Sequence, residues 1–108
     1  MTFYQTLQTI GNTLGIPVAY SYFKTGGMNS PEYPPYMVYM GNGQDNFEAD
    51  NTHYHSRNRY RLEYYFTEKN EALEADLEEA LLGAGFLYEK SEDTFIESEG
   101  VFVIYYLI

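Results

Sequence analysis

The sequence predicts an α+β domain: one mainly antiparallel sheet of four to five strands, with two helices packed on one face. Apolar residues recur at helical spacing in two segments, residues 2–14 and 70–83. Between them, residues 53–66 alternate apolar and charged side chains, as a half-buried strand does. Short links between the predicted strands favour antiparallel pairing. The 108 residues suffice for a single domain, residues 1–108, with the element order α-β-β-β-α-β-β.

The first helix is predicted over residues 2–14, with Thr2 as its cap. Gly15 and Pro17 disfavour a continuation of this helix. Its buried face consists of apolar residues three or four apart: Phe3, Leu7, Ile10 and Leu14.

Three strands are predicted between the helices. Residues 18–23 and 36–40 form the first two, separated by a loop over residues 24–35 that contains three of the four prolines. Residues 41–46 have the composition of a turn, and the chain continues to residue 51 without clear periodicity. The third strand spans residues 53–66 and has one apolar and one charged face. The apolar face holds Tyr60, Leu62, Tyr64 and Phe66, and the charged face holds Arg57, Arg59, Arg61 and Glu63.

The second helix is predicted over residues 70–83, with Asn70 as its cap and Gly83 and Gly85 at its end. Its inner stripe consists of Leu73, Leu77, Ala80, Leu81 and Ala84. Four acidic residues are predicted to lie mostly outside this stripe: Glu71, Glu74, Glu78 and Glu79.

The carboxyl-terminal part is predicted to form two strands, residues 86–91 and 95–108, the latter bent near Gly100. The last eight residues are apolar on both faces. Phe102, Ile104, Tyr106 and Ile108 point one way, and Val101, Val103, Tyr105 and Leu107 point the other. Two helices cover only one face, so the second apolar set predicts a surface for self-association. The alternative is that the loops at residues 24–35 and 41–52 fold over it. We therefore take Phe102, Ile104, Tyr105 and Tyr106 as interface candidates.

Composition limits the classes of function. Six Lys and Arg oppose sixteen Asp and Glu, and the net charge of −10 disfavours binding to nucleic acids and anionic membranes. No apolar run approaches the length of a membrane span, and residues 1–5 lack the features of a signal peptide. The absence of cysteine removes thiolate chemistry and is consistent with a cytoplasmic protein.

No nucleotide-binding or catalytic motif is present, so we expect a protein that is not an enzyme and has no cofactor. His53 and His55, with Asp50 or Asp45, could form a divalent metal site, but two surface histidines are the more economical interpretation. Arg57, Arg59 and Arg61 form a ladder on one strand face. Given sixteen carboxylates, we expect this ladder to pair with acidic residues across strands or subunits, rather than with phosphate.

Several segments together resemble small tail-terminator, or head–tail joining, proteins of long-tailed phages and prophages of Gram-positive bacteria. The likeness spans nearly the whole chain. The segments that carry it are residues 15–20 (GIPVAY), 34–39 (PPYMVY), 41–51 (GNGQDNFEADN), 60–65 (YRLEYY) and 86–90 (FLYEK), with the acidic, leucine-rich helix between the last two.

This resemblance implies a non-enzymatic virion assembly protein that forms a ring, commonly a hexamer. The ring would cap the tail-tube protein and join it to the head connector, first in the host cytoplasm and then in the virion. Contacts with these partners are expected from the loops, whose candidate residues are Asn42, Gln44, Asp45, Phe47 and Asp50. The alternatives are a small ligand- or metal-binding module built on His53, His55 and Asp50, another prophage neck component, or an anti-host factor.

Overall fold

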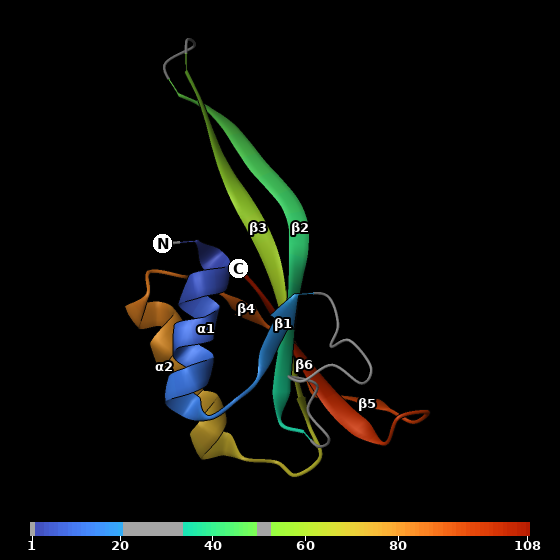
Figure 1. Ribbon diagram of the computed structural model, residues 1–108. Coiled ribbons are helices and arrows are strands. Elements are labelled where there is room, and N and C mark those ends of the chain that lie inside the picture. Colours follow the sequence, from blue (N-terminus) through green and yellow to red (C-terminus); the bar gives the residue numbers. More distant parts are fainter. Residues whose placement is uncertain (1, 21–33, 50–52) are drawn as a thin grey trace.

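A computed structural model describes residues 2–20, 34–49 and 53–108, and the side chains of all of these except residues 45–49 and 53–57. Two helices lie side by side on one face of a twisted sheet (Figure 1). This confirms the predicted α+β class. The elements are α1 (Phe3–Leu14), β1 (Val18–Tyr20), β2 (Tyr36–Ala49), β3 (His53–Phe66), α2 (Glu71–Gly83), β4 (Glu89–Lys90), β5 (Thr94–Ile96) and β6 (Val101–Leu107).

The strand order across the sheet is β1-β2-β3-β6-β4, and β5 pairs with β6 beyond the end of β4. Only the pairing of β1 with β2 is parallel; every other pairing is antiparallel. The carboxyl-terminal strand β6 is therefore an inner strand, with β3 on one side and β4 and β5 on the other.

Both predicted helices are present, and both amino-terminal caps are confirmed. The Thr2 hydroxyl accepts a hydrogen bond from the Gln5 backbone N–H at 3.1 Å, and the Gln5 side chain accepts from the Thr2 N–H at 2.9 Å. The Asn70 side chain likewise accepts from the Leu73 N–H at 3.0 Å. These caps satisfy backbone donors that no helical carbonyl can reach, which fixes where each helix begins.

The core lies between the helices and the near face of the sheet. The apolar face predicted for residues 53–66 is confirmed, because Leu62, Tyr64 and Phe66 are buried there and Tyr60 packs against them. The helices contribute Phe3, Leu7, Ile10, Leu77 and Leu81, and β6 contributes Ile104 and Tyr106.

The predicted turn at residues 41–46 is wrong, because β2 runs on through it to Ala49. The register of β2 against β3 shifts between Gly41 and Gln44, and Gly43 has a φ of 79°. An extra residue in one strand of an antiparallel pair makes a β-bulge, for which glycine supplies the left-handed conformation. The glycine-rich segment therefore bends a strand and does not end it.

The carboxyl-terminal part also differs from the prediction. Residues 95–108 are not one bent strand but two strands, β5 and β6, joined by a turn that ends at Gly100, whose φ is 67°. The strand predicted at residues 86–91 contracts to Glu89–Lys90.

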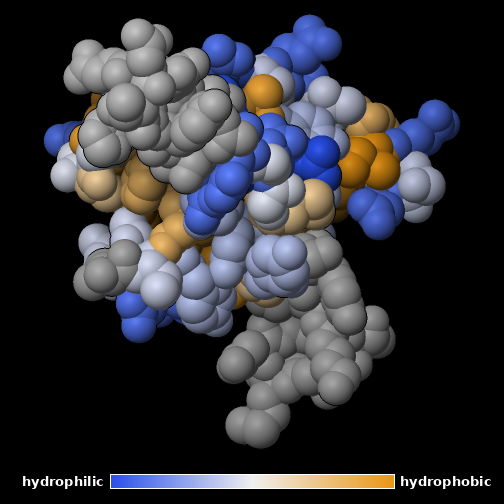
Figure 2. Space-filling model, turned by 90° about the horizontal axis from the view of Figure 1, so that it is seen from above, coloured by the Kyte–Doolittle hydropathy of each residue, from blue (hydrophilic) through white to orange (hydrophobic). Residues whose placement is uncertain are grey.

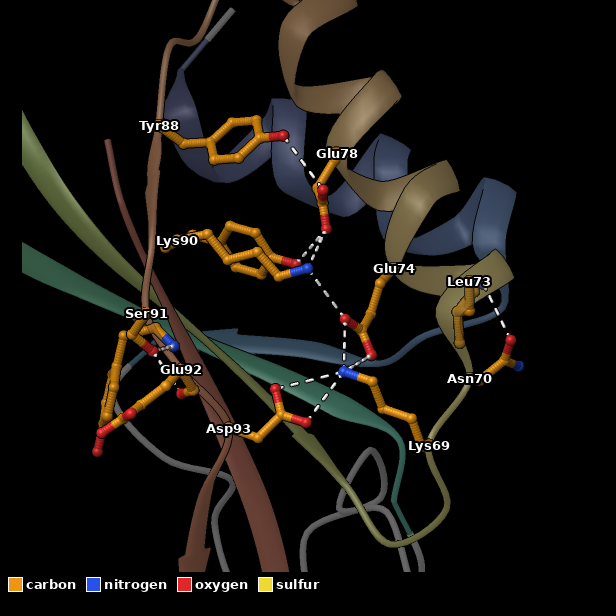
Figure 3. A network of polar contacts seen from close by, with 12 residues as sticks. Lys69, Asn70, Leu73, Glu74, Glu78, Tyr88, Lys90, Ser91, Glu92 and Asp93 are labelled. Carbon is orange, nitrogen blue, oxygen red and sulfur yellow. Dashed lines mark hydrogen bonds and ion pairs between the residues drawn. The ribbon is translucent and has the colours of Figure 1, made fainter.

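A polar network fastens α2 to the sheet (Figure 3). Glu74 is only 3% exposed, contrary to its predicted place outside the inner stripe, and it lies 2.8 Å from the Lys69 Nζ and 3.0 Å from the Lys90 Nζ.

Glu78 accepts hydrogen bonds from Lys90 and Tyr106, both at 2.8 Å, and from Tyr88 at 3.2 Å. Burial alone would raise the pKa of Glu78, but these donors outweigh it and lower that pKa. Both lysines of the described chain are thereby engaged with carboxylates.

No helix in the described residues is long and apolar enough to cross a membrane.

Candidate interaction surface

A two-stranded arm projects from the body of the molecule. The arm consists of residues 42–49 of β2 and 53–59 of β3, which pair with each other. β1 pairs with β2 only over Met37–Tyr39, and β6 pairs with β3 only over Arg61–Phe66. In the described residues no other strand flanks the arm, and Figure 1 shows it extending well beyond both helices. At 3.3 Å per residue the arm reaches about 25 Å, and it accounts for the elongated dimensions of 50 × 28 × 28 Å.

The root of the arm is held by stacked aromatic rings. The Phe3 ring lies parallel to the Tyr60 ring at 3.9 Å, and it meets Tyr39 and Phe86 edge-on at 5.5 and 5.1 Å. The Tyr60 N–H and C=O also bond the Ile108 backbone. Aromatic pairs of this kind add to the stabilisation from burial alone. The arm thus leaves the body from a fixed base.

The far face of the sheet, turned away from the helices, carries a buried carboxylate. Glu63 is 5% exposed and accepts hydrogen bonds from the Arg61 Nε at 3.0 Å and from the Tyr65 hydroxyl at 2.5 Å. Burial and the bond to Glu63 raise the pKa of Tyr65 well above its ordinary value, so this hydroxyl keeps its proton. The Arg61 guanidinium lies 5.6 Å from the centre of the Tyr105 ring, a cation–π contact.

A hollow of about 380 Å³ adjoins this cluster. We call it the β4–β6 hollow, and it is lined by Arg61, Glu89, Lys90, Ser91, Tyr105 and Leu107. Arg61, Leu107 and Glu89 are neighbours in register across three strands, which places them on the far face. Tyr105 and Leu107 are only half-buried. The predicted interface candidates Arg61 and Tyr105 therefore come together in one surface feature.

Two other interface candidates are wrong. Ile104 and Tyr106 have no exposed surface and belong to the core beneath the helices. Phe102 is half-buried, in a row of rings between Phe66 at 5.4 Å and Phe95 at 4.9 Å. Phe95 ends this row at the surface with 52% of its area exposed.

The far face of β6 is more covered than the sequence predicts. Val101 is 8% exposed and Val103 is fully buried within a single copy of the chain. Only the Tyr105–Leu107 half of this face is left open. One of the two loops expected to fold over β6, residues 41–52, does not do so, because its described part is the arm.

The arginine ladder is only partly described. Arg61 pairs with an acidic partner, Glu63, but on its own strand and not across strands or subunits as predicted. Arg59 lies two residues earlier on the same face and is half-buried. Arg57 lies opposite Asp45 in the strand register. The side chains of Arg57, Asp45 and Phe47 are outside the described part, whereas Asn42 and Gln44 are exposed at the arm's base, where Gln44 donates to Asn58 at 2.7 Å.

The proposed metal ligands lie outside the described side chains. His53 and His55 are placed only by their backbone, in register with Ala49 and Phe47, and Asp50 is outside the described residues altogether. Among the side chains that are described, no group of three or more metal-ligating residues is brought together.

Charge is divided unequally along the chain. Residues 62–108 contain twelve of the sixteen acidic residues and two of the six basic ones, so they carry the whole net charge of −10. Residues 1–61 are balanced. Seen from the arm's end of the molecule, hydrophilic side chains cover much of the surface, with smaller hydrophobic patches between them (Figure 2).

This arrangement is suited to contacts with protein. An arm whose outer edges pair with no other described strand and a half-apolar hollow can both bind another chain. The roles of Glu63 and Tyr65 were missed in the sequence. Their signal is a carboxylate and a tyrosine two residues apart, on the strand face that also carries Arg61.

No family model, curated protein or solved structure compared with this chain matches it.

Proposed function

We propose that this protein is a non-enzymatic assembly subunit of a long-tailed phage or prophage, of the tail-terminator kind. Its copies form a ring, a hexamer in the form that the resemblance implies. The ring caps the tail-tube protein and offers a surface to the head connector. Assembly takes place in the host cytoplasm, and the subunit remains in the virion.

The arm carries this proposal on the structural side. A two-stranded hairpin is at best marginally stable alone in water, and this one has no described neighbour beyond its root. A subunit of an assembly can stabilise such an arm by placing it against another protein. Residues 42–49 of the arm belong to the segment at residues 41–51 that takes part in the family resemblance.

The charge of the chain supports the same proposal. A terminator ring surrounds the path of the DNA and must not hold it. A net charge of −10 repels phosphate, which lowers non-specific adhesion of DNA to the ring.

The test is whether the chain caps tubes of the tail-tube protein from the same phage or prophage. Purified tube protein is polymerised with and without the chain, and the tubes are examined by electron microscopy. We expect shorter tubes with added density at one end. A second acidic protein of similar size is the control. Tubes of unchanged length and bare ends would refute the proposal.

A further inference from the structure

We propose that an uncharged surface beside α1 pairs with the same surface of a second copy about a two-fold axis. We call it the α1 patch. It consists of the exposed side chains of two segments, residues 2–20 and 80–88, neither of which contains a charged side chain. This inference goes beyond the proposed function and does not depend on it.

The large apolar side chains that remain exposed gather in these two segments. In the described part of the chain there are five, namely Tyr4, Tyr20, Leu82, Leu87 and Phe95. All except Phe95 belong to the α1 patch, and Leu87 is the most open of them, with 74% of its area exposed. Phe95 lies apart on β5, between Asp93 and Glu97 in the sequence. Exposed apolar groups that cluster in this way mark an interaction surface.

Ring contacts make the two segments one surface. The Phe3 ring on α1 meets the Phe86 ring of the second segment edge-on at 5.1 Å, and Figure 1 shows the loop after α2 beside the amino-terminal end of α1. The centre of the Tyr39 ring lies 5.8 Å from that of Tyr4 and 5.2 Å from that of Tyr20. The two exposed tyrosines therefore pack on one buried ring, which holds them in place.

The remaining exposed face of α1 is polar but carries no charge. It includes Gln5, Thr9, Asn12 and Thr13. The neighbouring helix α2, in contrast, exposes the carboxylates of Glu71, Asp76 and Glu79. The centres of protein interfaces are depleted of charged residues and enriched in tyrosine, with charged groups at the rim. The α1 patch has this composition, and Glu79 and Glu89 flank its second segment.

Charge selects the occupant of the α1 patch. The exposed face of α2 and the carboxyl-terminal strands are acidic, so a basic partner is attracted to them and not to an uncharged surface. An acidic partner can approach closely only where no carboxylates face it. A second copy is such a partner, because it has the same net charge of −10.

A two-fold contact has a requirement that the α1 patch meets. About a two-fold axis a surface meets itself, so charged residues near the axis face residues of the same sign. A patch without charge avoids this repulsion. Its hydroxyl and amide groups both donate and accept hydrogen bonds, so they can pair with their own kind, and its apolar groups can pack on one another. The α1 patch is therefore self-complementary, whereas an acidic face is not.

The experiment compares the masses of variants in solution by sedimentation, over a range of protein concentrations. Leu87→Glu and Tyr4→Glu each place a charge in the α1 patch. Tyr4 lies in the first turn of α1, where a carboxylate favours the helix. Phe95→Glu is the matched control, because it also replaces an exposed apolar side chain by a carboxylate, but outside the patch. Circular dichroism checks folding, and Leu82→Glu replaces a variant that does not fold.

We expect particles of the wild type and of Phe95→Glu to contain the same even number of copies, and those of Leu87→Glu and Tyr4→Glu to have half that mass. The dissociation constant of the pair should rise by about tenfold or more in these two variants, because a charge enclosed in an apolar contact is costly. Added salt should leave the wild-type pair intact, because salt screens the repulsion between the acidic bodies.

Four results overturn the inference: a wild type without paired copies, patch variants with the wild-type mass, a control that dissociates as they do, and a pair that salt dissociates. Loss of tube capping by Leu87→Glu with self-association unchanged assigns the α1 patch to the tube protein and also overturns it. Tube capping by the wild type is the separate test of the proposed function, so either proposal can fail without the other.

Discussion

At the scale of single residues, Glu78 shows how an acidic helix is held on a sheet. Three donors from three positions outside α2 converge on its carboxylate, from Tyr88, Lys90 and Tyr106. Because these donors lower the pKa of Glu78, the ionised form stabilises the fold. These hydrogen bonds join α2 to β4 and β6, so their loss weakens the packing of α2 on the sheet.

Tyr106→Phe is expected to lower the free energy of unfolding by about 1.5 kcal/mol near neutral pH, because it removes a buried hydrogen bond to a charged acceptor. The contribution of Glu78 is present above its ordinary pKa of 4.5 and is lost as the pH falls through the lower value in the folded state. The difference between wild type and variant should therefore shrink in acid. Urea unfolding at several pH values measures it. Tyr4→Phe, at a position 44% exposed, is the control. A difference that is constant with pH would contradict this role for Glu78.

The two histidines require a test of their own, since their side chains are not described. If the arm serves assembly, divalent ions should leave the melting temperature of the chain unchanged. If His53, His55 and Asp50 instead hold a metal, ions should stabilise the fold in a concentration-dependent way that His53→Ala abolishes. Thermal unfolding with zinc, manganese and calcium distinguishes these outcomes. A stabilisation lost in His53→Ala would favour the metal-binding alternative.

At the scale of elements, the periodicity of apolar residues correctly predicted both helices and β3. The positions of glycines did not correctly predict where strands end. Residues 53–66 were predicted to the residue, because the alternation of apolar and charged side chains specifies a strand with one buried face. Gly43 and Gly100 both have positive φ, yet one bulges a continuous strand and the other ends a turn between two strands. The same local conformation serves both purposes, and only pairing with a distant strand decides between them.

The burial of Glu74 was unpredictable for a related reason. Its helical position is compatible with exposure. The lysines that allow its burial are distant in the chain, because Lys69 lies five residues before Glu74 and Lys90 lies sixteen residues after it. A buried carboxylate is tolerated only with such partners, whose approach depends on the tertiary fold. The two wrong interface candidates, Ile104 and Tyr106, share this cause. The sequence showed two apolar faces on β6, but not which one the helices cover.

A pair of helical glycines tests the packing of the elements. A Cβ at Gly11 would lie 2.5 Å from the Ile16 carbonyl oxygen and 2.7 Å from a Val18 methyl group, so α1 and β1 approach too closely for any side chain. Gly11→Ala should therefore destabilise the fold by about 2 kcal/mol. Gly83→Ala is the matched control, because nothing lies within 4 Å of its Cβ position in α2. It should be neutral or stabilising by up to about 1 kcal/mol. Equal effects of the two substitutions in chemical unfolding would contradict the close contact.

At the scale of the whole molecule, the net acidic charge and the projecting arm belong to different parts of the chain. Residues 62–108 carry the whole net charge of −10, and the arm leaves the body from an aromatic root. Two copies of such a body repel one another, and salt screens this repulsion. The composition predicted the repulsion of nucleic acid. The arm escaped prediction because its glycines and polar residues have the composition of a loop.

The most direct test of the account is the mass of the unmodified chain in solution, alone and mixed with its tail-tube protein. The account predicts an oligomer of this chain in at least one of the two samples. A chain that sediments as a monomer of 12.6 kDa in both samples, at every salt concentration, would contradict it.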